Sequence, residues 1–207
     1  MLFRSLTRER LVTAAECLAD RDADLATILR RHGPPPMWAR KPGFPTLVRI
    51  ILEQQVSLAS ARSTFNRLTA SVIPFSPERF VALGTPYFRS VGVTRQKSAY
   101  CVHVAREIAE GRFDLDTVGR MSDVDAKAAL TQITGIGPWT AEIYLLMALR
   151  RADVWPVSDL ALLTSLGRLK RLRERPAPAK AARIAERWRP FRSVAARMLW
   201  QHYLAGM

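Results

Sequence analysis

A short glycine turn between two helical stretches constrains the fold of this chain more than any other feature. Residues 135–137 read Gly-Ile-Gly, and such a pair lets the backbone turn sharply and approach a partner without side-chain obstruction. Pro138 follows, and its missing N–H suits the first position of a helix. The mostly apolar residues 139–149 predict a buried helix, and the next acidic groups include Asp159. A glycine turn followed by a helix N-terminus is typical of a phosphate-binding device.

The rest of the chain also has the periodicity of helices. Apolar residues recur at i, i+3, i+4 and i+7, and no segment shows sustained period-two alternation. Proline and glycine breaks at 33–36 and 41–43 separate an N-terminal pair of helices from the remainder. We therefore predict an all-α protein with helices over 7–20, 22–31, from Pro45, 57–69, from Ser76, from Thr85, from Thr94, from Ser122, 159–169, 179–188 and 192–204.

Length and composition exclude several classes of protein. With 207 residues the chain can bury a core as one domain or two small ones, and its apolar runs are far shorter than the ~20 residues of a membrane span. The N-terminal apolar stretch contains acidic residues, unlike a secretory signal, so we expect a cytoplasmic protein. Two cysteines and three histidines do not make a zinc or iron–sulfur ligand set. No cofactor for catalysis is expected.

The charge balance favours a polyanionic partner. Lysine and arginine number 32 against 18 acidic residues, which gives a formal charge of +14. The alternative is a basic protein from a genome rich in G and C, in which arginine displaces lysine. The charge-dense stretch 168–175 is expected to be a solvated loop that can face DNA.

Several motifs together resemble one known family. The segments are QITGIGPWTAEI at 132–143, DVWPVSD at 153–159, ILEQQVSLASA at 51–61, GVTRQKSAY at 92–100 and ERWRPFRSVAARMLW at 186–200. Taken in their order along the chain, they resemble the helix-hairpin-helix (HhH-GPD) DNA glycosylase superfamily, specifically its 3-methyladenine DNA glycosylase II branch. The resemblance covers about three quarters of the chain.

The resemblance implies an all-α fold of two helical subdomains with a DNA-binding cleft between them. One subdomain would be a central bundle over 45–150 that ends in the helix-hairpin-helix. Residues 1–44 and 151–207 would together form the other. Some relatives carry an additional N-terminal β-domain, and this chain resembles the short form without it.

Asp159 is the candidate catalytic residue. Its position matches the catalytic aspartate of the family, where a carboxylate stabilises the positive charge that develops on the sugar. The structural alternative is a helix N-cap, for which aspartate is common. Both roles are compatible in one residue.

Aromatic residues are expected to line the base pocket. Trp139 and Trp200 match the aromatic pocket positions of the family, although Trp200 on an apolar stripe is also consistent with a core residue. Tyr144 is a further candidate, one position after the tyrosine of relatives, where this chain has Ile143. Aromatic faces favour cationic bases.

The hairpin is expected to grip DNA through its main chain. The amides of Gly135 and Gly137 would donate to a phosphate, and Thr140 is a further candidate DNA-binding residue. The alternative is a plain helix–helix turn. In the family an alkali ion, Na⁺ or K⁺, often bridges hairpin carbonyls to the phosphate. By position, the carbonyls here would belong to Thr131, Ile133 and Ile136.

Gln54 and Gln55 match the family's probe of the gap that a flipped base leaves. Gln55 replaces the apolar wedge of many relatives, so its intercalation is in doubt, although its amide could bond the orphaned base. Gln54 continues an apolar stripe, and a satisfied buried amide explains it equally well.

These observations predict a monofunctional DNA glycosylase of base excision repair. It would flip 3-methyladenine or 7-methylguanine out of damaged double-stranded DNA and hydrolyse the N-glycosidic bond. Relatives that also cut the strand have a hairpin lysine where this chain has Trp139, and no lysine lies between Lys127 and Lys170. The alternatives are a glycosylase for deaminated or oxidised bases, or a non-enzymatic helix-hairpin-helix DNA-binding protein. The resemblance implies a monomer that associates with a bacterial-type nucleoid through DNA.

Overall fold

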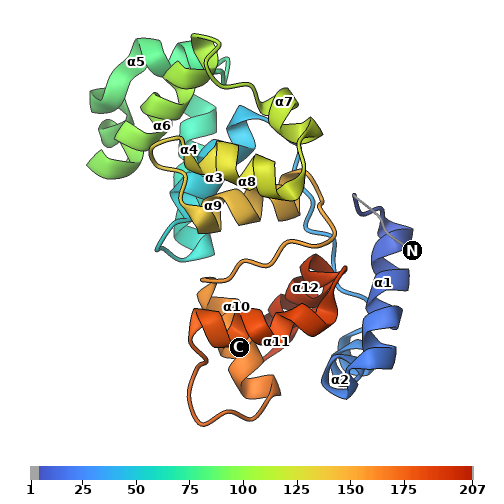
Figure 1. The fold of residues 1–207 in the computed structure, drawn as a ribbon. Helices are drawn as coiled ribbons and strands as arrows, with labels where there is room; N and C mark the ends of the chain where they lie inside the picture. Colours follow the sequence, from blue (N-terminus) through green and yellow to red (C-terminus); the bar gives the residue numbers. More distant parts are fainter. Residues whose placement is uncertain (1–4, 207) are drawn as a thin grey trace. The chain divides into compact units, whose positions relative to one another are not determined.

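Helices make up the regular structure of the computed structural model, which describes residues 5–206 (Figure 1). Within this range the extended pairing is limited to an isolated antiparallel bridge between Ser5 and Arg151. The predicted all-α class is therefore confirmed. Nor does any described helix have the length and apolar character needed to cross a membrane.

The chain divides into two compact units. Unit 2 is continuous, from Arg40 to Tyr144, and unit 1 combines the residues up to Ala39 with those from Leu145 onward. These limits lie five or six residues before the expected 45 and 150. Near these limits, Arg40 Nη1 donates to Glu53 Oε2 at 2.8 Å within unit 2, and the Arg151 amide donates to the Leu145 carbonyl at 3.0 Å within unit 1.

Unit 2 is built around a helix that is buried on nearly every side. This helix, α3 (Phe44–Glu53), is apolar at Leu47, Val48 and Ile50, each with no exposed surface. The ring of Phe80 packs 4.9 Å from that of Phe44, in an aromatic cluster that fills the space beside α3. The other helices of the unit are α4 (Leu58–Ser71), α5 (Pro77–Ser90), α6 (Arg95–Ala109), α7 (Leu115–Arg120), α8 (Asp123–Thr131) and α9 (Pro138–Ile143).

Unit 1 is organised around its last helix, α12 (Arg192–Ala205), which is buried over 193–200. This helix packs against α1 (Arg8–Arg21), α2 (Ala23–His32) and α10 (Leu160–Leu169). Ser165 Oγ donates to the Leu199 carbonyl at 2.7 Å and thereby joins α10 to α12 without leaving a buried hydroxyl unsatisfied. A helix α11 (Pro178–Ala185) and a 3₁₀ turn (Glu186–Trp188) complete the unit.

Most predicted helix starts are confirmed by the cap geometry. The side chains of Thr7, Asp22, Thr94 and Ser122 each accept a hydrogen bond from a main-chain amide of the first turn. The predicted break before Thr85 is also present, because Gly84 has a φ of +67° inside α5.

Two elements were missed. Helix α7 has only six residues, too few to show a period, and the predicted helix over 139–149 is α-helical only to Ile143. It continues as a π-helix over Tyr144–Ala148, where the chain passes from one unit to the other. A continuous apolar run has no period that distinguishes a π-helix from an α-helix, so the π-helix could not be predicted.

Candidate functional site

The hairpin between α8 and α9 depends on one glycine for packing and leaves the other open. Gly135 has a φ of +97°, and a Cβ there would lie 2.5 Å from Cβ of Tyr100 in α6. Gly137 has an ordinary φ of −79°, and a Cβ there would meet no atom within 4 Å. Gly135 is therefore required by the fold, whereas Gly137 leaves the N-terminus of α9 accessible to a partner.

Gln54 supports the hairpin through two hydrogen bonds. Its Nε2 donates to the Gly135 carbonyl at 3.0 Å and to Thr140 Oγ1 at 2.8 Å, so both amide hydrogens are used within unit 2. Thr140 is 1% exposed. Of the two explanations for Gln54, this geometry favours the satisfied amide, and contacts of Gln54 or Thr140 with DNA stay predictions.

Gln55 is placed differently from its neighbour. Its side chain is exposed and its φ is +55°, in the turn between α3 and α4. Val56 and Leu58, which follow, are 43% and 61% exposed. This loop presents one amide and two apolar side chains to solvent, so Gln55 is accessible to a partner as a probing residue must be.

Two lysines reinforce the hairpin and its support, and sequence reasoning did not single them out. Lys127 Nζ in α8 lies 2.6 Å from Oε1 of the buried Glu142 in α9, across the turn. Lys97 Nζ donates to the Leu52 carbonyl at 2.7 Å near the end of α3, and its burial lowers its pKa. The ion pair between Lys127 and Glu142 could have been suggested by the spacing of these two opposite charges around the glycine turn.

In unit 1, Asp159 is both the cap of α10 and the neighbour of Trp200. Its Oδ1 accepts a hydrogen bond from the Leu162 amide at 2.9 Å and another from Trp200 Nε1 at 3.1 Å. Asp159 is partly buried and Trp200 is 8% exposed. The cap and the placement beside an aromatic ring thus occur together, with the carboxylate held by two N–H donors.

A further tryptophan, not predicted, belongs to the same cluster. The ring of Trp38 lies 6.3 Å from that of Trp200, edge to face at 70°. Trp38 follows the proline break at 34–36 and belongs to no helical period. The sequence could therefore have suggested its place in the site only by its aromatic character.

The two remaining pocket candidates belong to unit 2. Trp139 is partly buried at the second position of α9. Tyr144 has no exposed surface; its hydroxyl accepts a hydrogen bond from the Gly43 amide at 3.0 Å, and burial raises its pKa. Tyr144 thereby anchors the break at 41–43, and its contact with a base stays a prediction.

The alkali-ion site expected at the hairpin carbonyls of Thr131, Ile133 and Ile136 stays a prediction. Within residues 5–206 no group of three or more His, Cys, Asp or Glu side chains could hold a metal ion. The Ile133 carbonyl accepts the Ile136 amide at 3.0 Å, which closes the turn and uses one of its two lone pairs. Carbonyl oxygens are ligands that hard cations prefer.

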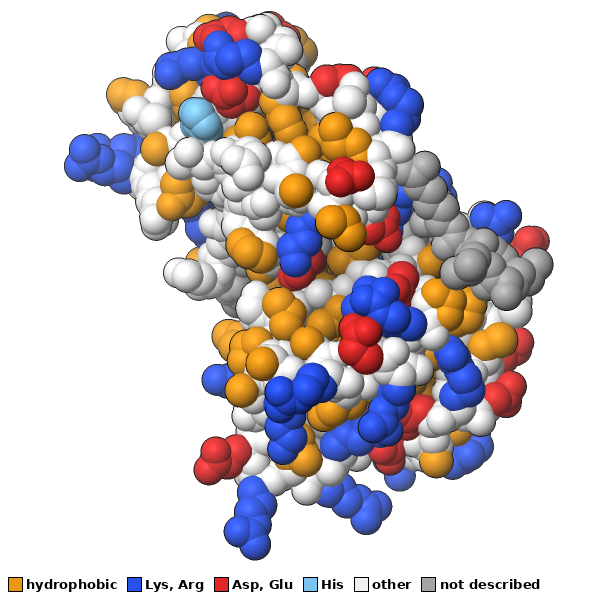
Figure 2. Space-filling view, viewed as in Figure 1, with side chains coloured by type: hydrophobic (Ala, Val, Ile, Leu, Met, Phe, Trp, Pro, Cys, Tyr) orange, Lys and Arg blue, Asp and Glu red, His pale blue; other side chains and the backbone are white. Residues whose placement is uncertain are grey.

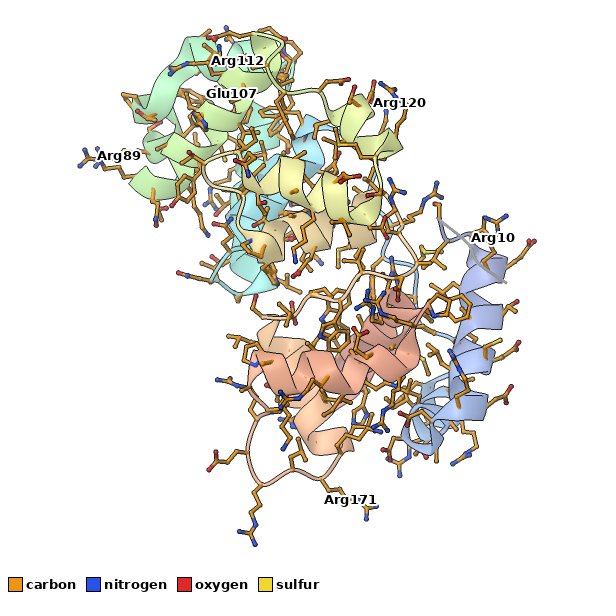
Figure 3. All side chains as sticks on the ribbon, viewed as in Figure 1. Arg10, Arg89, Glu107, Arg112, Arg120 and Arg171 are labelled. Carbon is orange, nitrogen blue, oxygen red and sulfur yellow. The ribbon has the colours of Figure 1, made fainter. Side chains whose placement is uncertain are left out.

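Basic side chains are spread over the surfaces of both units (Figure 2). Arg89, Arg120 and Arg171 extend outward from their own units (Figure 3). In the stretch 168–175, which was expected to be solvated, Arg171 is exposed. Lys170 instead pairs with Asp22 at 3.0 Å and Asp24 at 2.7 Å, so it joins the loop to α2.

Comparison with known proteins gives consistent matches. Residues 48–190 match the model of the HhH-GPD superfamily, described as base excision DNA repair proteins. The chain is 27% identical to YfjP of Bacillus subtilis over 186 residues and 29% identical to the DNA-3-methyladenine glycosylase of the same organism over 170 residues. These matches cover 86% and 76% of this chain, but only 64% and 56% of the two relatives.

A solved structure is similar over more of its length. The Schizosaccharomyces pombe 3-methyladenine DNA glycosylase Mag1, in complex with abasic DNA, superposes with a TM-score of 0.85 at 27% identity. The similarity covers 91% of this chain and 95% of Mag1 in that structure.

Proposed function

The chain belongs to the HhH-GPD superfamily of base excision DNA repair proteins, and from this premise we propose that it is a monofunctional DNA glycosylase for alkylated purines. The observation that carries the proposal is the carboxylate of Asp159, held by the Leu162 amide and by Trp200 Nε1. The names of its relatives, DNA-3-methyladenine glycosylases, support the same substrate class.

The chemistry requires a fixed anion beside the sugar. As the N-glycosidic bond breaks, the base leaves with the bonding electron pair and positive charge develops on the deoxyribose. A carboxylate ~4 Å from that charge stabilises it by about 4 kcal/mol at an effective dielectric of ~20. This corresponds to roughly a thousandfold in rate. Two N–H donors fix Asp159 in advance, so little reorganisation is needed when the charge appears.

A water molecule completes the reaction. Its oxygen forms the new bond to C1′, and its proton passes to Asp159 or to solvent. Methylation at N3 or N7 of a purine makes the base cationic, and a cationic base leaves as a neutral molecule. Strong acid catalysis is therefore unnecessary, and an aromatic residue such as Trp200, beside Asp159, would favour such a base.

DNA would be held through the hairpin. The open approach at Gly137 gives a phosphate access to the first amides of α9, and Gly135 sets the turn. The carbonyls of Thr131, Ile133 and Ile136 would hold a Na⁺ or K⁺ ion, which would add positive charge beside the phosphate. The substrate would be damaged double-stranded DNA, as the abasic DNA bound to Mag1 suggests.

We expect no strand cleavage through a Schiff base. The hairpin position of a lyase lysine is occupied by Trp139. The nearest lysine before it, Lys127, is engaged with the buried carboxylate of Glu142. The product would be an intact strand with an abasic site.

The test is release of 3-methyladenine and 7-methylguanine from methylated duplex DNA. The wild-type protein is compared with Asp159→Asn, and the panel includes duplexes with hypoxanthine and 8-oxoguanine. Release of methylated purines by the wild type, lost in the variant, supports the proposal. If the wild type releases no methylated base above a mock preparation, the substrate assignment is wrong.

A further inference from the structure

Trp38 has a backbone conformation that its residue type disfavours. Its φ is +46°, in the left-handed region that a bulky side chain rarely adopts. Such conformations persist only where the surrounding structure fixes them, and they cluster at functional sites. The ring that results lies against Trp200, whose Nε1 donates to Asp159. Trp38 is partly exposed, whereas Trp200 is 8% exposed, so Trp38 offers the more accessible ring of the pair.

Arg197 in α12 bonds the main chain directly before Trp38. Its Nε donates to the carbonyl of Met37 at 2.9 Å, immediately before Trp38. Its Nη1 donates to the Ser193 carbonyl at 3.0 Å and its Nη2 to the Leu146 carbonyl in the π-helix at 2.8 Å. One planar guanidinium thus joins the Trp38 segment, Leu146 of the π-helix and α12, and all three contacts lie within unit 1.

Arg197 is fully buried, although arginine side chains are usually exposed in folded proteins. Its exposed surface is 0%, and the hydrogen bonds that the described chain gives it all go to main-chain carbonyls. A buried cation is costly unless hydrogen bonds compensate it, and three carbonyl dipoles do so here. Burial lowers the pKa of Arg197 to about 9, which still leaves it protonated at neutral pH. Lysine could not reproduce the planar fork that reaches three acceptors.

We propose that Trp38 is a specificity-determining residue that contacts the extruded cationic purine beside Asp159, and that Arg197 is the residue that positions it. This inference rests on the proposed function. A partly exposed aromatic ring that packs on Trp200, the tryptophan bonded to Asp159, favours a cationic base over a neutral one of the same shape. Trp38 would therefore contribute selectivity for methylated purines more than general DNA affinity.

The experiment measures binding separately from turnover. The probes are two duplexes with 2′-fluoro nucleotides, which resist glycosidic cleavage, one carrying 7-methylguanine and the other guanine at the same position. We expect Trp38→Ala to reduce the preference for the methylated duplex by about tenfold, and Trp38→Phe to retain most of it. Tyr203→Ala, which removes another partly buried aromatic side chain of unit 1, serves as the matched control and should leave the preference unchanged.

The positioning role is tested with a double-mutant cycle. Arg197→Lys should lower the preference in the same direction, and it should add little in the Trp38→Ala background, because the contact that it positions is already lost. If Arg197→Lys fails to fold, Arg197→Gln, whose amide can still donate to one carbonyl, takes its place in the cycle. Losses that add fully in the double variant would overturn the positioning role.

The outcomes separate this inference from the proposed function. An unchanged preference in Trp38→Ala, with the wild type active on methylated DNA, overturns the role of Trp38 and leaves the glycosylase assignment intact. Absence of base release by the wild type overturns the proposed function, and the binding preference then shows by itself whether Trp38 recognises a cationic base.

Discussion

The hairpin of unit 2 and the Asp159 cluster of unit 1 present their chemistry in opposite ways. The hairpin offers main-chain groups, and side chains such as Gln54 and Lys127 lie behind it as supports. The Asp159 cluster offers side chains, and main-chain groups such as the Leu162 amide hold them. A phosphate is the same in every nucleotide, so main-chain donors suffice for it, whereas a particular base needs particular side chains.

The largest effect that this contrast predicts is at the side-chain site. Asp159→Asn should lower the rate of base release by roughly a thousandfold, because an amide cannot neutralise the developing positive charge. Asparagine is as good an N-cap as aspartate, so stability should change little. Asp159→Ala should add a loss of about 1 kcal/mol in the free energy of unfolding, measured by chemical denaturation. Equal activity of Asp159→Asn and the wild type would remove the distinction between the two regions.

At the hairpin, the largest expected effect is on the fold. Gly135→Ala places a Cβ 2.5 Å from Tyr100 at a φ of +97°, so it combines a clash with backbone strain. We expect a loss of about 2–4 kcal/mol in the free energy of unfolding. Thermal unfolding of the variant measures this loss, and a melting temperature equal to that of the wild type would contradict the described packing.

The buried carboxylate of Asp22 is expected to make the stability of unit 1 depend on pH. Burial of Asp22 opposes ionisation, but hydrogen bonds from Trp188 and Lys170 and the charge of Lys170 outweigh it, so the pKa lies below the ordinary 3.8. This stabilisation is fully present above pH 3.8 and is lost as the pH falls through the lowered pKa.

Asp22→Asn should therefore cost about 2 kcal/mol at neutral pH and less in acid. The free energy of unfolding of the wild type and of Asp22→Asn, measured from pH 2 to 7, tests whether the difference between them narrows in acid. A difference that stays constant over this range would contradict the prediction.

The smallest effect is expected at Gly137. A Cβ there meets no atom within 4 Å, so Gly137→Ala should leave stability unchanged to within about 0.5 kcal/mol. It should nevertheless weaken binding to duplex DNA by about threefold to tenfold, because the methyl group obstructs the approach of a phosphate. Fluorescence anisotropy at fixed salt measures the affinity. A variant that is destabilised but binds normally would reverse the assignment of the two glycines.

The local parts of this architecture could be predicted from the sequence. Thr7, Asp22 and Ser122 identified helix starts, since a cap depends on residues within one turn. The glycine turn identified the hairpin for the same reason.

The long-range contacts could not be predicted. Arg197 lies in an apolar helix, and only the fold brings it to Met37, 160 positions away in the chain. Lys170 reads as a solvated charge until α2 places two carboxylates beside it. Trp38 belongs to no periodic pattern, so its place near Asp159 depends on the arrangement of unit 1 as a whole.

The discontinuity of unit 1 has a consequence for how the protein is made. Helices α1 and α2 are synthesised before unit 2, yet the helix against which they pack, α12, is synthesised after it. The continuous unit 2 can complete its folding in the interval, while the earlier helices remain without their core. Because Trp200 belongs to α12, a nascent chain has no finished carboxylate site until α12 has been synthesised.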